Sequence, residues 1–288
     1  MLSKTEGRNQ ATGRAAILGL LLLPLVFLTT SVRAEAVMER VTERGTLVAA
    51  AVPDELPLAA RDASGALTGF DVEVAQEIAK RLGYPVTFVT PGWGAILAGG
   101  WNGKWDFSVS SITPTEVRSR FINFPATYRF DAAVVLVHEN NRSATMPAHL
   151  SGKRIGVKAG TTFENYLMHD LTIYEGEVPV EYVIVDPEIH RYADKDQAVS
   201  ALAKGDGRIV DAVVTSFAPA KAAIARGVPI RIVPGFLFWE PVAVAIDQGD
   251  DAFAQRMHDI VDDMMEDGTL GALSVKWFGI DMTAPLLR

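Results

Sequence analysis

Strand and helix patterns alternate along most of the chain, and this alternation limits the fold more than any other feature. Residues 46–52 are typical of a buried strand, and residues 69–83 are helical, with apolar side chains at every fourth position. Two more strand patterns follow at 85–89 and 106–111. Because strands that alternate with helices form parallel sheets covered by helices, the sequence predicts an α/β fold.

The same alternation begins again in the second half of the chain. An extended segment at 132–137 is followed by a linker at 139–151, and no repeat of fixed period relates the two halves. The chain has 288 residues, which fits two domains of medium size. The later strands are predicted at 154–160, 180–185, 211–215 and 241–246, and the later helices from Thr162 and at 196–205, 251–268 and 269–279.

The first 34 residues have the pattern of a secretory signal peptide. Basic residues precede an apolar run at 15–28, and Val32 and Ala34 are small enough for a signal peptidase. The run is shorter than the roughly 20 apolar residues that span a bilayer, so a membrane anchor is the weaker alternative. We expect cleavage near Ala34 or Ala36 and a mature protein in the periplasm.

Composition excludes several classes of function. The chain has no cysteine, so it forms no disulfide and has no thiolate nucleophile. Its net charge is −8, and the predicted signal peptide holds more basic than acidic residues, so the remainder is more acidic still. Nucleic acids and anionic membranes need clustered basic surface, so neither is expected as a partner. We expect a monomer.

Sequence motifs for metals, cofactors and catalysis are absent. The five histidines are scattered without metal-ligand spacing, and no HExxH, CxxC or DxDxDG pattern occurs. The two glycines of residues 204–208 lack the rest of a phosphate-binding loop, and there is no GxSxG motif. The sequence therefore predicts no metal, no cofactor and no catalytic residue.

One polar segment, SSITPTEVRSR at 110–120, raises a question about function. Four hydroxyl-bearing residues and a proline precede Arg118 and Arg120, between two segments of extended character. This pattern suits a capped helical turn, and it also suits a binding site for a small anion. The local pattern leaves both interpretations open.

A set of segments in a fixed order carries a resemblance to a known family. The segments are ERVTERGTLVAAAVPD, LTGFDVEVAQEIAKRLG, GKWDFSVSSITPTEVR, FINFPATY, GKRIGVKAGTTFENYL and DGTLGALSVKWFG. Together they resemble the polar amino-acid class of periplasmic solute-binding proteins, family 3, which serve ABC importers. The resemblance covers nearly all of the chain after the predicted signal peptide. Each motif is weak by itself, and their order makes the resemblance specific.

The resemblance implies a type II periplasmic-binding-protein fold. In this fold, two α/β lobes, each with a mostly parallel sheet flanked by helices, are joined by two crossover strands. We place lobe 1 at residues 35–136 and 243–288, lobe 2 at 137–242, and the crossovers near 132–137 and 241–246. The ligand is expected between the lobes, which close around it.

The resemblance also implies which residues bind the carboxylate of the ligand. Arg118 matches the family's carboxylate-binding arginine, and Ser111 and Thr113 match the hydroxyl and backbone groups beside it. A guanidinium presents paired N–H donors that suit a planar carboxylate. Thr161 and Thr162 match a second-lobe loop that closes over the same group, although a threonine there also suits a plain helix cap.

Other candidate ligand residues depart from the family pattern. Trp93 matches an aromatic wall position, or alternatively belongs to the core, and Asp54 and Glu55 lie in a loop where the family has an aromatic residue. Ser216 stands where the family commonly has an aspartate for the α-ammonium group. A hydroxyl does not neutralise a buried cation. Glu55 or Glu240 is a candidate substitute for that acid, and each also suits a solvated loop.

These features favour a non-enzymatic function. We expect an extracytoplasmic binding protein that delivers a small carboxylate-bearing solute, a polar amino acid or a derivative, to the membrane permease of an ABC importer. One alternative is an enzyme similar to cyclohexadienyl dehydratase, which acts on prephenate or arogenate and has the same fold; Glu55, Glu240 and the Ser216 departure keep it open. Another is that the liganded protein signals to a membrane sensor.

Overall fold

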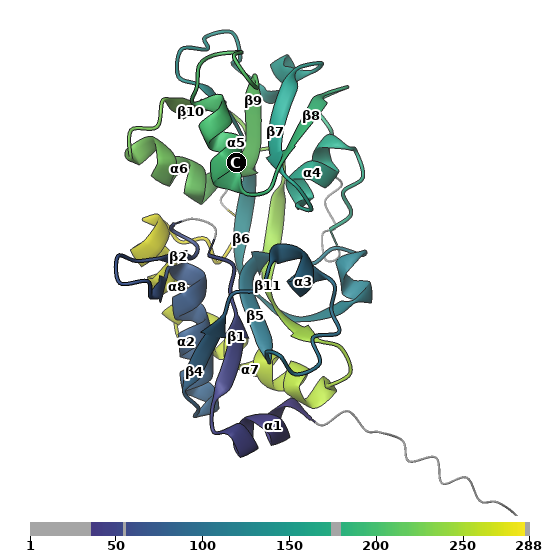
Figure 1. Ribbon diagram of the computed structural model, residues 1–288, viewed down its shortest axis with the longest axis vertical. Helices are drawn as coiled ribbons and strands as arrows, with labels where there is room; N and C mark the ends of the chain where they lie inside the picture. Colours follow the sequence, from purple (N-terminus) through teal and green to yellow (C-terminus); the bar gives the residue numbers. More distant parts are fainter. Residues whose placement is uncertain (1–35, 54–55, 174–179, 286–288) are drawn as a thin grey trace, which may run out of the picture. The chain divides into compact units, whose positions relative to one another are not determined.

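The computed structural model describes residues 36–53, 56–173 and 180–285 (Figure 1). The strands are β1 (Leu47–Ala50), β2 (Ala60–Arg61), β3 (Leu67–Thr68), β4 (Val86–Val89), β5 (Phe107–Ile112), β6 (Ile122–His138), β7 (Arg154–Lys158), β8 (Glu188–Tyr192), β9 (Ala212–Ser216), β10 (Ile230–Ile232) and β11 (Trp239–Asp247). The α-helices are α1 (Val37–Arg44), α2 (Phe70–Leu82), α3 (Trp93–Leu97), α4 (Thr162–Leu167), α5 (Lys195–Leu202), α6 (Phe217–Ala225), α7 (Asp251–Glu266) and α8 (Thr269–Phe278), and two short 3₁₀ helices are η1 (Arg118–Arg120) and η2 (Pro147–Leu150).

Two groups of mostly parallel strands meet at the long strand β6, and β11 runs beside β6 on the first-lobe side. In the first lobe, β1 pairs in parallel with β4 and β5, and β11 is antiparallel to both β5 and β6. In the second lobe, β7 pairs in parallel with β8 and β9, while β9 and β10 are antiparallel to β6. The predicted α/β fold with two lobes and two crossover strands is therefore confirmed (Figure 1).

The first of the two crossovers between the lobes lies within one uninterrupted strand, β6. The sequence indicated two extended segments around 121–137, and the structure joins them into the 17-residue β6. Along β6, Ala132 pairs with Trp239 of β11, and the next residue, Ala133, pairs with Ser216 of β9. The strand thus changes partner at this point, which brings Ser216 next to the junction of the lobes.

Helix α2 forms where the sequence predicted it, for the predicted reason. Phe70, Val74, Ile78 and Leu82 are all buried in one cluster, so the four-residue spacing marks the face that packs on the sheet. The helix ends at Gly83, which has a φ of 83°, and its N–H bonds to the carbonyls of the last turn. A left-handed residue at this place is a common helix end, and glycine adopts it without strain.

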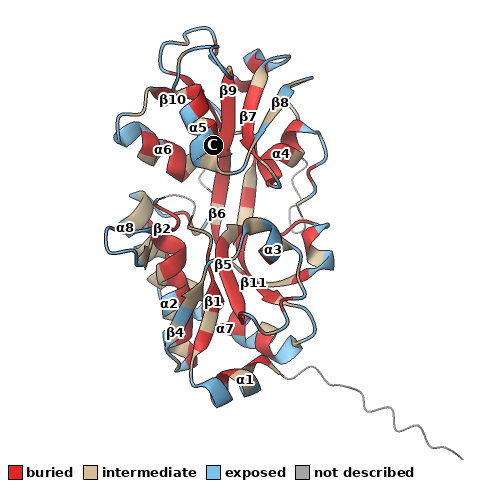
Figure 2. Ribbon diagram, in the orientation of Figure 1, coloured by how far each residue is buried: buried red, intermediate tan, exposed pale blue. Residues whose placement is uncertain are grey.

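Helices cover both faces of the first-lobe sheet. Helix α7 buries five residues of one face, and it shares a core with α1, α2 and α8. Trp101 and Trp105 pack on the opposite face with Ile96 of α3. Figure 2 shows that β5, β6 and β9 are buried along most of their length. The buried residues of α7 are Phe253, Met257, Ile260, Val261 and Met264.

Side chains of β6 alternate between the two cores of the second lobe. Ala133, Val135 and Val137 belong to the core that contains α4, and Val134 and Leu136 belong to the core that contains α5 and α6. Successive side chains of a strand point to opposite faces, so a continuous apolar run indicates a strand covered on both sides. The end of β6 is such a run.

The strand predicted at 180–185 is wrong. The structure has no strand there, and the strand beside β7 is β8, further along the chain. The backbone of 180–185 bonds to side chains instead: the N–H of Val183 donates to the Tyr166 hydroxyl at 3.0 Å, and the Ile184 carbonyl bonds to the His169 ring at 2.8 Å. An apolar run can therefore fill a core without joining a sheet.

The predicted signal peptide, residues 1–34, lies outside the described residues. Within the described part of the chain, none of the helices combines the length and the apolar character that crossing a bilayer requires.

Replacing Ile78 tests the core of the first lobe. Its side chain is fully buried, so Ile78→Ala should lower the free energy of unfolding by about 2–5 kcal/mol, through lost burial and a residual cavity. Ile209→Ala removes the same groups from a side chain that is 42% exposed, and should lower it by less than about 0.5 kcal/mol. Denaturant titration measures both values, and equal losses would contradict this placement of α2.

Candidate functional site

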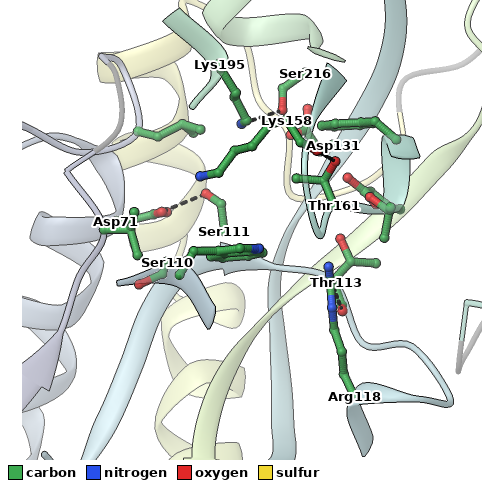
Figure 3. Close-up of a pocket in the computed structure, with 16 residues that line it drawn as sticks. Asp71, Ser110, Ser111, Thr113, Arg118, Asp131, Lys158, Thr161, Lys195 and Ser216 are labelled. Carbon is green, nitrogen blue, oxygen red and sulfur yellow. Dashed lines mark hydrogen bonds between the residues drawn. The ribbon is translucent and has the colours of Figure 1, made fainter. Parts of the chain in front are cut away.

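Side chains from both lobes and both crossover strands line a cavity at the carboxyl ends of β5, β7 and β9 (Figure 3). In α/β folds, ligands bind outside the carboxyl ends of the strands, so this is the expected place for a site. The lining residues are Val52, Leu58, Asp71, Trp93, Ser110, Ser111, Thr113, Arg118, Asp131, Lys158, Thr161, Thr162, Phe163, Lys195, Ser216 and Glu240.

Arg118 is fixed to the cavity wall by backbone bonds. The Thr115 hydroxyl accepts from its N–H at 3.2 Å, which caps the turn that leads into η1, in agreement with one of the two sequence interpretations. The guanidinium donates from Nη1 to the Thr113 carbonyl at 2.8 Å and from Nη2 to the Gly160 carbonyl at 3.1 Å. The capped turn thus places a cation where first-lobe and second-lobe residues meet.

Burial weakens the basicity of Arg118 without removing its charge. Arg118 is buried, as is Arg129. Burial lowers the pKa of Arg118 to about 10, and the charge of the nearby Glu240 carboxylate opposes this shift. A pKa of about 10 keeps the guanidinium protonated at neutral pH. The cavity therefore contains a fixed positive charge in a place shielded from water.

The two threonines at the start of α4 have different roles. Thr161 is the helix cap: its hydroxyl accepts from the Glu164 N–H and donates to the Lys158 carbonyl at 2.7 Å. Thr162 is buried, and its hydroxyl acts on the Glu240 carboxyl by lowering the pKa of that group. The side chain of Thr161 is thus occupied locally, whereas the side chain of Thr162 faces the acid in the cavity.

Trp93 lies on the cavity wall, at the start of α3. Its ring centroid is 5.5 Å from the Arg118 guanidinium carbon and 5.0 Å from the Lys158 ammonium nitrogen. Its indole N–H donates to the Gly160 carbonyl at 3.1 Å, the same oxygen that accepts from Arg118. Trp93 is therefore a wall residue that contacts cations from both lobes.

The hydroxyl of Ser111 is held within a buried network. It donates to Asp71 at 2.6 Å and accepts from Arg129 at 2.8 Å, while the Ser111 N–H donates to the Tyr128 hydroxyl at 3.0 Å. Ser111 also has a φ of 52°, a left-handed conformation that few residues other than glycine adopt. Its contacts within the protein fix this strained corner of the cavity.

Two acids from the crossover strands face each other across the sheet. Glu240 of β11 pairs in register with Asp131 of β6, and both side chains are buried. Burial and the Asp131 charge raise the pKa of Glu240, although the Thr162 and Thr113 hydroxyls and the Arg118 charge oppose this. Asp131 lies 3.5 Å from Arg129. The acids are thus held between cations and hydroxyls.

Ser216 ends β9 and is almost completely buried. Its hydroxyl accepts from the Lys195 ammonium group at 3.1 Å. Asp54 and Glu55 lie outside the described residues. The structure therefore brings the other eight predicted ligand residues to one cavity, namely Trp93, Ser111, Thr113, Arg118, Thr161, Thr162, Ser216 and Glu240. Over the described ranges, no cluster of side chains suits a metal ion.

A sequence model of bacterial extracellular solute-binding proteins, family 3, matches residues 47–280, which include every element from β1 to α8. The chain belongs to this family. Its resemblance to family 3, first indicated by the order of six short motifs, is thereby confirmed.

Relatives within family 3 are named as binding proteins. The L-cystine-binding protein TcyJ of Escherichia coli is 28% identical over 94% of this chain and 97% of its own. The histidine-binding periplasmic protein of Salmonella typhimurium is 27% identical over 80% of this chain and 86% of its own. Extended similarity of this kind agrees with a binding protein and not with an enzyme.

Solved structures of family 3 type share the fold. A mutant of ArgBP from T. maritima has a TM-score of 0.72 and 25% identity, and covers 84% of this chain and 99% of its own. An ancestral amino-acid-binding protein, AncCDT-1, described as a precursor of cyclohexadienyl dehydratase, gives 0.72 and 26% with the same coverage. That relative is itself a binding protein, so the dehydratase alternative is not favoured.

Sequence reasoning missed four charged residues of the cavity, Asp71, Asp131, Lys158 and Lys195. Lys158 ends β7, and Lys195 begins α5. Their positions could have indicated the site, because the carboxyl ends of parallel strands and the first turns of the following helices come together at one edge of the sheet. Asp71 lies in α2 and Asp131 lies in β6. The apolar residues of these two segments already account for the helix and the strand, so the sequence pattern did not assign either aspartate to the site.

Glu240→Gln should raise thermal stability at neutral pH and leave it unchanged in acid. In the folded protein the pKa of Glu240 is raised above its ordinary value of 4.5. The wild-type protein is therefore most stable, as far as Glu240 is concerned, below pH 4.5. It loses stability as the pH rises and the buried carboxyl group ionises. Gln cannot ionise. The difference in Tm between variant and wild type should grow from about pH 4 to about pH 8, at roughly 2–4 °C per kcal/mol.

The exposed Glu266 provides the matched control, since Glu266→Gln removes the same charge at the surface of α7. It should leave the dependence of Tm on pH unchanged. A Glu240→Gln difference that is constant with pH would show that burial does not penalise this carboxylate.

Proposed function

We propose that this family 3 protein binds a small carboxylate-bearing solute, a polar amino acid or a derivative, and delivers it to the membrane permease of an ABC importer. One observation carries the proposal: Arg118, buried and protonated, lines the cavity together with Thr113 and Thr162. The names of the cystine-binding and histidine-binding relatives support an amino acid as the ligand.

Arg118 has the chemistry for a carboxylate. Guanidinium carries five N–H donors, and its contacts with the Thr113 and Gly160 carbonyls leave donors for a ligand. A charge-assisted bond is roughly twice as strong as a neutral one, and the shielded position strengthens it further. The Thr113 and Thr162 hydroxyls line the same cavity and can donate to the bound carboxylate.

Closure of the lobes completes the site. In this proposal, residues 35–136 and 243–288 move as lobe 1, residues 137–242 move as lobe 2, and β6 and β11 bend between them. Hinge closure is well known for periplasmic binding proteins. The bonds from Trp93 and Arg118 to the Gly160 carbonyl support a closed form that these contacts stabilise.

The proposal includes export of the protein from the cytoplasm. Residues 1–34 serve as a signal peptide, cleavage occurs near Ala34 or Ala36, and the mature protein acts in the periplasm as a monomer. The family's extracellular description supports this location.

Arg118→Ala tests the carboxylate site. Losing two charge-assisted hydrogen bonds should weaken amino-acid binding by about 100-fold or more, measured by titration calorimetry with the tightest ligand of an amino-acid panel. Arg120→Ala is the control, because Arg120 is exposed and pairs with Glu116 at 2.8 Å. Equal affinities of the Arg118→Ala variant and the wild type would falsify the assignment.

Trp93→Phe tests closure separately from charge recognition. The variant keeps an aromatic wall and loses the hydrogen bond to Gly160, so affinity should fall by about two- to tenfold. Small-angle scattering should show a smaller ligand-induced compaction. Trp277→Phe in α8 is the control, because its indole nitrogen has no hydrogen-bond partner within the described ranges. An unchanged affinity would argue against this contact as a closing bond.

A further inference from the structure

The carbonyl of Gly160 joins the two lobes, and its direction depends on the loop between β7 and α4. It accepts from the Trp93 indole and from the Arg118 guanidinium, each at 3.1 Å. Gly160 has a φ of 72°, in the left-handed region. Glycine adopts this conformation without strain, but it also leaves it more easily than other residues do. Contacts of the surrounding loop must therefore hold this carbonyl in place.

The side chain of Glu164 provides such a contact on the other side of Gly160. Its Oε2 accepts from the Gly160 N–H at 2.7 Å. The Glu164 N–H donates to the carbonyl of Thr161 at 3.1 Å and to its hydroxyl. In a capping box, a glutamate three residues after the helix cap bonds back to the N–H of the cap itself. Here the side chain reaches one residue further, to Gly160, and joins the loop to the first turn of α4.

Arg191 holds the same carboxylate from a neighbouring strand. Its Nε donates to Oε1 of Glu164, and Arg191 lies on β8, in register with Val157 of β7. Figure 1 shows α4 on the same side of the second lobe as β8. Each oxygen of Glu164 thus accepts from one donor, and one of these donors belongs to the sheet. Contacts therefore run from the sheet through Glu164 to the Gly160 peptide.

The position of Glu164 makes these bonds strong and keeps it away from the ligand. Its side chain is only 10% exposed, so little water competes for its oxygens, and a charged acceptor in such a place forms strong hydrogen bonds. Among the described residues that line the cavity, Glu164 does not occur. Any effect of Glu164 on ligand binding must therefore pass through the loop.

We propose that Glu164, braced by Arg191, is a positioning residue for lobe closure. It fixes the Gly160 peptide so that the carbonyl can accept from Trp93 and Arg118. The inference rests on the proposed binding function and identifies what sets the geometry of its closing contacts. Without this brace the loop takes up other conformations, and closure has to order it first, which weakens binding.

Two variants of Glu164 test the proposal on the purified protein. Glu164→Ala should weaken binding of the tightest ligand of the amino-acid panel by about tenfold, measured by titration calorimetry. Small-angle scattering should show a smaller ligand-induced compaction. Glu164→Gln keeps an oxygen for the Gly160 N–H but loses the charge, so the loss of affinity should be about three- to fivefold.

Asp211 offers a matched control in the same lobe. Its Oδ2 accepts from the Arg154 N–H at 2.9 Å, and its Oδ1 accepts from Nη2 of the same arginine at 3.0 Å. Asp211 thus combines a backbone N–H with a guanidinium, as Glu164 does. Arg154 begins β7, at the end of the strand away from the cavity. Asp211→Ala should lower the Tm and leave affinity within about twofold of the wild type.

A double-mutant cycle with Trp93→Phe separates positioning from a general weakening of the second lobe. Both residues act through Gly160, so Glu164→Ala should cost less affinity in the Trp93→Phe variant than in the wild type. Losses that simply multiply would show that the two residues act independently, and would overturn the inference.

The outcomes separate this inference from the proposed function. If both Glu164 variants bind within about twofold of the wild type while Arg118→Ala abolishes binding, the inference is wrong and the binding function stands. If Glu164→Ala does not fold, the nearly isosteric Glu164→Gln decides alone by the same limit. If the wild type binds no amino acid of the panel, the proposed function is contradicted and this inference with it.

Discussion

The antiparallel pairing of β6 with β11 is the constraint on which the site depends. It continues from Ile122 opposite Asp247 to Ala132 opposite Trp239, and from the next residue on β6 pairs with β9 of the second lobe. Its register also places Glu240 opposite Asp131 at the edge of the cavity. Like charges opposed across strands are destabilising, so this register requires compensation nearby. Arg129 and Arg118 provide that compensation from the first lobe.

The many buried charges at the cavity are better explained by ligand binding than by a contribution to folding stability. Removing ions from water is expensive, and buried ion pairs often contribute no more stability than apolar residues of similar volume. The chain has extensive apolar cores in both lobes, and most of its buried charged side chains lie at the cavity or in the network behind it. Perturbed ionisable groups in a cleft are typical of functional sites. The buried charges and shifted pKa values in this region therefore agree with the proposed binding of a charged ligand.

Sequence patterns predicted the parts of the structure that depend on local order. The helices α2 and α7 followed from apolar periodicity, and Arg118, Thr113 and Thr162 followed from motifs in which site residues are neighbours in the chain. Lys158 and Lys195 were missed because they reach the cavity from separate elements, and neither belongs to a local motif. The segment 180–185 was misjudged because an apolar run does not reveal whether its backbone bonds to a strand or to side chains.

Recognition and closure are linked through the carbonyl of Gly160. This second-lobe oxygen accepts from Arg118 and from Trp93, both in the first lobe, so the residue proposed to bind the carboxylate also joins the lobes. A ligand shifts a conformational equilibrium only by its different affinity for the two states. A ligand that contacts Arg118 and also a second-lobe residue of the cavity, such as Thr162, joins the two lobes in the same way. A ligand that contacts both lobes therefore stabilises the closed form, whereas a compound that contacts only one lobe does not favour closure.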